Sequence, residues 1–163
     1  MNDEIDFYID TTYTAANNFD CGFEVFNEYL KNNTPKDKAV FHYIIDARND
    51  NLIAYFSLLS SCVLVGDFAE HTFIPAIELK MFAMDKKYQK RNLSNNLVDA
   101  IVEIVNEYSS EYVGAELLVL YSVPAEQVVS MYEKSGFQKL PAEYFMYKSY
   151  FSEGCISMYK VVD

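Results

Sequence analysis

A cluster of basic side chains is the first feature of this sequence that could do chemistry. Four of the thirteen basic residues fall within six positions: Lys86, Lys87, Lys90 and Arg91. The chain as a whole carries a formal net charge of -11, so a local group of cations predicts a specific anion site, with a solvated helix entrance as the alternative. A helix that starts at this point would add unpaired backbone N–H groups and the positive end of its dipole. Together, Gln89, Lys90 and Arg91 predict a pocket for a phosphate-sized anion.

Two elements must position this basic turn. Residues 77–84 are apolar enough to form a strand that leads into it. Apolar residues then recur at helical spacing, which predicts an amphipathic helix of about four turns; they are Leu93, Leu97, Ile101, Ile104, Val105 and Tyr108. The motif is therefore strand, basic turn, long helix.

The rest of the chain predicts an α+β fold in a single domain over residues 1–163, with helices packed against one mixed sheet. Further strands are expected over 5–9, 41–47, 52–64, 117–121, 137–140 and 156–162. Further helices are expected over 23–31, near Pro35 and over 125–135, where Gly136 ends the last one. A turn at 49–51 and a loop over 66–75 connect the strands.

The segment from Phe82 to Leu97 resembles a stretch of the GCN5-related N-acetyltransferase (GNAT) superfamily, in which a strand is followed by Q/R-x-x-G-x-G/A and a helix. Gln89 matches the first position of that motif, and Asn92 and Ser94 stand where its two small residues usually lie. Glycine there permits unusual φ angles. Asparagine is the next most tolerant residue in left-handed backbone. Serine is small, so of the two departures Ser94 is the milder.

Three further segments are similar to GNAT proteins, so that the resemblance covers residues 17 to 162. Residues 128–137 resemble A-x-x-F-Y-x-K-x-G-F, in which the tyrosine matches Tyr132. Residues 18–30 resemble the N-terminal F-x-C-G…L-x-x-Y-L of the toxin-like branch. Residues 54–58 resemble the G-Y-Y-S-L of the same branch.

The resemblance implies acetyl-CoA as co-substrate and assigns roles to named residues. The residues it places against acetyl-CoA are Phe82, Ala83, Met84, Gln89, Lys90, Arg91, Asn92, Leu93, Ser94 and Asn95. Glu78 is the candidate general base, with a solvent-facing strand position as its alternative. The Met84 N–H would suit the developing oxyanion. Tyr132 is the candidate general acid, with a core position as its alternative.

Three functions stay open at this stage. The first is an N-acetyltransferase that acts on a small-molecule or peptide amine. The second is a toxin-type GNAT that acetylates aminoacyl-tRNA, against which the acidic charge argues, because tRNA requires a positive surface. The third is a non-catalytic GNAT scaffold that binds a protein partner. A homodimer is left open by the aromatic segment 142–151, which could equally line the acceptor site or pack under a connection.

Other features of the sequence predict a cytoplasmic protein without a metal. The three cysteines and two histidines lack the spacing of a metal site and suit reduced thiols. The N-terminus lacks the apolar region of a signal peptide, and no apolar run is long enough to span a bilayer. The net charge of -11 also argues against anionic membranes as partners.

Overall fold

The computed structural model describes residues 5–14, 18–32, 38–66, 70–146 and 153–163. It consists of two compact units, the first comprising Met1–Leu59 with Lys80–Leu93 and the second comprising Ser60–Leu79 with Ser94–Asp163. Strands β3 (Leu52–Gly66) and β4 (His71–Met84) each contribute residues to both units.

The sheet of the first unit has the order β1-β2-β3-β4. Strand β1 (Phe7–Asp10) pairs antiparallel with β2 (Val40–Asp46), which pairs antiparallel with β3. Asp50 in the β2–β3 connection has a φ of 56°, the left-handed backbone that Asx residues tolerate in turns. The predicted antiparallel hairpin over 41–64 is therefore confirmed.

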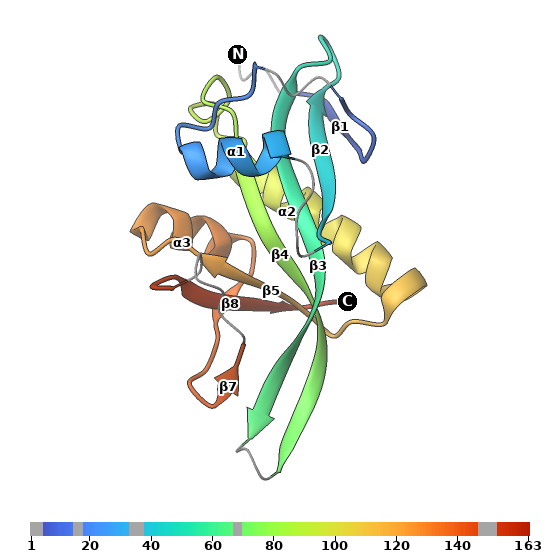
Figure 1. Ribbon diagram of the computed structural model, residues 1–163, viewed down its shortest axis with the longest axis vertical. Coiled ribbons are helices and arrows are strands. Elements are labelled where there is room, and N and C mark those ends of the chain that lie inside the picture. The colour runs from blue at the N-terminus through green and yellow to red at the C-terminus, as the bar shows by residue number, and fades with distance from the viewer. Residues whose placement is uncertain (1–4, 15–17, 33–37, 67–69, 147–152) are drawn as a thin grey trace. The chain divides into compact units, whose positions relative to one another are not determined.

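Helix α1 (Glu24–Asn32) lies in front of the sheet of the first unit (Figure 1). It contributes Leu30 to a buried cluster with Phe41, Tyr43, Ile45, Leu52, Tyr55 and Ala83. The Tyr55 hydroxyl donates a 2.7 Å hydrogen bond to the Phe26 carbonyl, so the ring is buried with its polar atom satisfied. Part of the high aromatic content therefore lies in the core beneath this helix.

The second unit contains the mixed part of the sheet, in the order β4-β5-β8-β6. Residues Ala76 to Leu79 of β4 pair in parallel with Leu117 to Leu120 of β5 (Leu117–Ser122). Strands β8 (Ile156–Val161) and β6 (Gln138–Lys139) continue the sheet with antiparallel pairing. A two-residue strand β7 (Tyr144–Phe145) pairs with the part of β3 in this unit.

Two helices belong to the second unit (Figure 1). Helix α2 (Ser94–Tyr108) buries Leu97, Val98, Ile101, Val102 and Val105, so its periodicity was predicted correctly. It continues into a five-residue π-helical segment, Ser109–Val113, which the sequence did not predict. Helix α3 (Glu126–Lys134) is followed by Gly136 at a φ of 87°, which fits the predicted helix end.

The α+β class is confirmed, and so is the predicted order of the elements that the described residues include, with some details wrong. The expected loop over 66–75 is too long, because β3 reaches Gly66 and β4 already begins at His71. Strand β7 was not predicted. The helix expected near Pro35 lies outside the described residues, since 33–37 are not among them.

The aromatic segment 142–151 is described as far as Met146. Met146 is 5% exposed and packs with Val63 and Leu117, and Tyr144 packs against the same cluster. Phe145 is 59% exposed. The packing interpretation is therefore confirmed for Tyr144 and Met146, whereas residues 147–151 lie outside the described part of the chain.

None of the described helices is long and apolar enough to cross a membrane. Within the same residues, the three cysteines form no disulfide. No group of His, Cys, Asp and Glu side chains there is arranged to hold a metal ion.

Candidate functional site

The basic turn predicted from the sequence follows directly after β4 and is open to solvent. Residues 86–92 form consecutive turns, and all four of their basic side chains are exposed. Lys86 forms an ion pair with Asp20, and this hydrogen bond raises the pKa of Lys86. The Arg91 guanidinium lies over the Tyr88 ring, 5.3 Å from its centroid. The turn therefore presents cations at the surface of the first unit.

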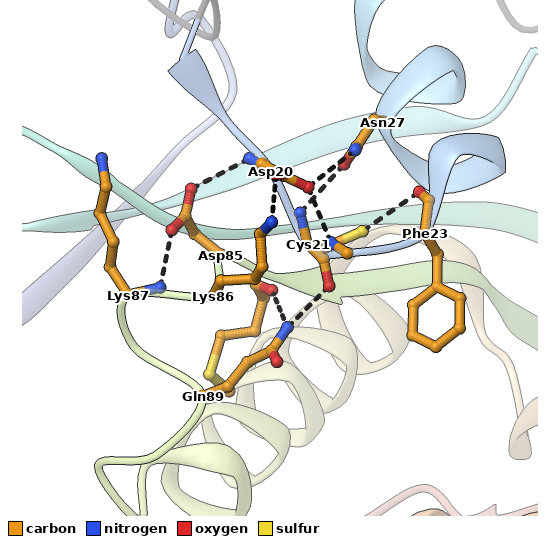
Figure 2. A network of polar contacts seen from close by, with 10 residues as sticks. Asp20, Cys21, Phe23, Asn27, Asp85, Lys86, Lys87 and Gln89 are labelled. Atoms are coloured by element: carbon orange, nitrogen blue, oxygen red, sulfur yellow. Dashed lines mark hydrogen bonds and ion pairs between the residues drawn. The ribbon is translucent and has the colours of Figure 1, made fainter.

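The side chains of Tyr88 and Gln89 anchor this turn to the rest of the first unit. Tyr88 is buried, and its hydroxyl donates a 3.3 Å hydrogen bond to Oδ2 of Asp46 at the end of β2. The side-chain amide of Gln89 donates to the carbonyls of Cys21 and Met84, both at 2.8 Å (Figure 2). The basic residues between them are thus carried on a fixed backbone.

Asn92 adopts a left-handed conformation, with a φ of 57°. This is the position at which the sequence resembles a motif that carries a small residue. Among the described residues, no backbone acceptor binds the N–H groups of Lys90, Asn92 and Leu93. Helix α2 starts two residues later, and its first N–H groups also have no intrahelical partner. Unpaired amides beside cations are what an anionic ligand requires.

The end of β4 also offers backbone donors. The Asp85 N–H donates a 2.9 Å hydrogen bond to the Ile53 carbonyl on β3. Because backbone groups alternate in direction along a strand, the N–H groups of Phe82 and Met84 point to the opposite edge of β4. The side chains of Ala83 and Met84 are buried, as expected for residues that would contact a ligand through the backbone.

In the second unit, Asn95 ties the start of α2 to the end of α3. Its Nδ2 donates to the Met131 carbonyl at 2.9 Å and lies 3.1 Å from the Ser135 hydroxyl oxygen. Asn95 and Ser94 are half-buried. The Asn95 side chain therefore serves to hold the two helices together.

Tyr132 lies on α3 with its ring 7% exposed and packed edge-to-face against Phe137 at 5.6 Å. Burial raises the pKa of Tyr132 well above its ordinary value of 10.0. The hydroxyl thus keeps its proton at neutral pH, which a general acid requires.

Glu78 lies on β4 opposite Val119 of β5 and is 7% exposed. The alternative that its side chain points to solvent is therefore wrong. The pKa of Tyr121 is raised, first by burial and then by the negative charge of Glu78. A buried carboxylate on a central strand suits a proton acceptor, although burial also occurs for purely structural carboxylates.

Sequence reasoning missed the buried Asp85 and its link to Asp20. Asp85 is 4% exposed, and its carboxylate accepts hydrogen bonds from the backbone N–H groups of Asp20 and Lys87 at 3.1 and 2.9 Å (Figure 2). An aspartate directly after a strand and before a turn is a known signal for side-chain-to-backbone hydrogen bonds. The partner 65 residues away carries no such signal.

The sequence matches no protein-family model and no curated protein. Solved structures do match. The AtaTR complex bound with acetyl-CoA has a TM-score of 0.71 and 20% identity, over 96% of this chain and 94% of that chain. A variant of the toxin AtaT bound to the C-terminus of the antitoxin AtaR has a TM-score of 0.71 and 19% identity, over 98% and 94% of the two chains.

A third solved structure is AtaT complexed with acetyl-methionyl-tRNAfMet, with a TM-score of 0.67 and 20% identity. The match covers 91% of this chain and 98% of that chain. At this level of identity the similarity establishes the fold. The chain therefore has the GNAT fold of these toxins, as the sequence resemblance implied.

Proposed function

We propose that the chain is an acetyl-CoA-dependent N-acetyltransferase of the toxin type, which acetylates the amino group of an aminoacyl-tRNA. The observation that carries this proposal is the similarity of fold, over most of both chains, to AtaT complexed with acetyl-methionyl-tRNAfMet. The N-terminal segment that resembles the toxin-like branch supports the same choice of acceptor.

Acetyl-CoA suits the residues of the basic turn. Lys90 and Arg91 are exposed cations, and left-handed Asn92 is followed by unpaired amides that can bind a diphosphate. The amides of Phe82 and Met84 can hydrogen-bond the pantetheine arm. The full set that we assign to acetyl-CoA is Phe82, Ala83, Met84, Gln89, Lys90, Arg91, Asn92, Leu93, Ser94 and Asn95, with Gln89 assigned by its backbone alone.

The proposed reaction is direct attack of the acceptor amine on the thioester carbonyl. Glu78 takes a proton from the amine, directly or through water. A C–N bond forms while the C–S bond breaks, and the Met84 N–H donates to the oxygen that gains negative charge. Tyr132 gives its proton to the departing CoA thiolate.

A small-molecule or peptide amine is the second candidate acceptor. The net charge of -11 favours it, because an acidic chain repels the tRNA backbone except near its basic turn. A non-catalytic scaffold is disfavoured by Asn92, whose φ of 57° preserves the backbone that a glycine would give.

We further propose that the chain works in the cytoplasm, as one domain over residues 1–163. A protein partner is supported by the structure of AtaT with the C-terminus of AtaR. A homodimer stays a prediction.

The test has two steps, each with its own control. Acetyl-CoA at about 100 times its Kd should stabilise the protein by about 2.7 kcal/mol in a thermal shift assay, with adenosine as the control ligand. Acetyl transfer is then measured at low salt with aminoacyl-tRNA, uncharged tRNA, small amines and peptides. Transfer to amines or peptides alone would replace the tRNA proposal with the second candidate, and no shift at millimolar acetyl-CoA would refute both.

A further inference from the structure

The side-chain amide nitrogen of Gln89 is already engaged within the protein. Its Nε2 lies 2.8 Å from the Cys21 carbonyl and 2.8 Å from the Met84 carbonyl. Both partners are acceptors, so the amide nitrogen must face them, and both of its N–H bonds are used. The side chain of Gln89 therefore has no donor left for a phosphate, although its backbone remains in the basic turn.

One end of this bridge fixes the last residue of β4. The Asp85 N–H is bonded to Ile53 on β3, so the Met84 carbonyl and N–H both point to the opposite edge of the strand. Gln89 binds that carbonyl and leaves the Met84 N–H available. The bridge thus restrains the backbone beside the amide that we assign to the acetyl group.

The other end of the bridge fixes the segment that leads into α1. The Cys21 N–H donates to Oδ1 of Asn27 on that helix at 3.0 Å. The backbone carbonyl of Asp20 accepts a hydrogen bond from the Lys86 N–H at 2.9 Å. The side-chain Oδ1 of Asp20 accepts a second one from the Gly22 N–H at 2.8 Å. Figure 2 shows these contacts converging on the Asp20–Cys21 segment from the turn and from the helix.

We infer that Gln89 is a positioning residue that locks the Asp20–Gly22 segment, and with it the start of α1, to the end of β4. The inference rests on the proposed function, because the geometry that Gln89 holds is that of the Met84 amide. Loss of the two donors leaves two carbonyls without this partner and loosens the link at Cys21, so that only the bonds of Asp85 and Lys86 to Asp20 still hold the segment to the strand end. The chemical step then slows, while the cations and amides that bind the diphosphate stay in place.

The test compares two substitutions at this position with a control elsewhere. Gln89→Glu keeps the shape, removes the donors and adds a carboxylate near Asp20 and Asp85. Gln89→Arg restores N–H donors of similar reach. Gln127→Glu is the matched control, since Gln127 is exposed on α3 and has no side-chain hydrogen bond among the described residues.

Two measurements separate positioning from general stability. Hydrogen exchange without ligand should be about tenfold faster at Cys21, Gly22 and Lys86 in Gln89→Glu, and near wild type in Gln89→Arg and Gln127→Glu. Steady-state kinetics should show kcat about tenfold lower in Gln89→Glu, with KM for acetyl-CoA within about threefold. Gln89→Arg should recover most of kcat.

The outcomes distinguish this inference from the proposed function. Wild-type exchange and kcat in Gln89→Glu would overturn the inference while leaving the acetyltransferase intact. A rise in KM for acetyl-CoA without loss of kcat would also overturn it, since Gln89 would then act on cofactor binding. If the wild type did not bind acetyl-CoA, the proposed function and the catalytic consequence of the bridge would be refuted. Faster hydrogen exchange in Gln89→Glu would still support the structural link.

Discussion

The left-handed backbone at Asn92 gives a prediction whose sign and size follow from the structure. At a φ of 57°, a non-glycine residue costs about 1–2 kcal/mol, and asparagine avoids part of that cost. The Asn92 side chain is exposed and makes no hydrogen bond among the described residues, so Asn92→Ala changes little besides this backbone preference. We expect the free energy of unfolding to fall by about 1 kcal/mol, which lowers Tm by about 2–4 °C.

The matched control is Asn96→Ala, four residues further along. Asn96 is exposed within α2, where alanine is the better helix former, so the same substitution should raise stability by up to about 0.7 kcal/mol. The free energy of unfolding of Asn92→Gly should stay within about 0.5 kcal/mol of the wild-type value. Glycine relieves the backbone strain of the folded state, but it also gives the unfolded chain more conformational freedom, and the two effects offset each other. Thermal and urea unfolding measure all three variants. A Tm for Asn92→Ala at or above that of wild type would refute the left-handed assignment.

Three other changes give defined outcomes. Tyr132→Phe keeps the buried ring and should lower kcat by about 100-fold or more, with little change in Tm or in KM for acetyl-CoA; an unchanged kcat would remove Tyr132 from the mechanism. The pKa of Asp20 is lowered from 3.8 to about 2, chiefly by the hydrogen bond from Lys86, so its contribution to stability is complete above about pH 4 and lost as the pH falls through 2. In Asp20→Asn, the free energy of unfolding from urea titrations should therefore change less between about pH 4 and pH 2 than it does in the wild type. The same pH dependence in both proteins would contradict the lowered pKa. Gly136→Ala should cost about 1–2 kcal/mol of unfolding free energy, because Gly136 has a φ of 87°; equal Tm values for the variant and wild type would argue against that backbone.

The local pattern of the chain predicted most of the elements. The spacing from Leu93 to Tyr108 predicted α2, because one face of that helix is buried along its whole length. The loop expected over 66–75 was too long because Pro75 interrupts an otherwise β-prone run. In the structure Pro75 lies within β4, and its carbonyl accepts the Glu116 N–H at 2.9 Å. Proline removes a donor from a strand but leaves this acceptor in place.

The site was predictable where its chemistry is local and not where it depends on distant partners. The basic turn and the conformational tolerance of Asn92 follow from neighbouring residues. The bridge from Gln89 to Cys21 joins residues 68 positions apart, and that from Asp85 to Asp20 joins residues 65 apart. Such pairs depend on tertiary packing, for which residue type and periodicity carry no signal.

Strand β7 is only two residues long, but it affects the tendency of this protein to aggregate in concentrated solution. The pairing of β3 with β2 ends at Leu58, and β7 takes up the neighbouring position at Leu64 and Val65. An open strand edge recruits other strands and promotes aggregation. By occupying those amides and carbonyls, Tyr144 and Phe145 shorten the stretch of β3 to which another molecule could add a strand. Proline substitution in β7 is thus expected to reduce solubility before it affects folding.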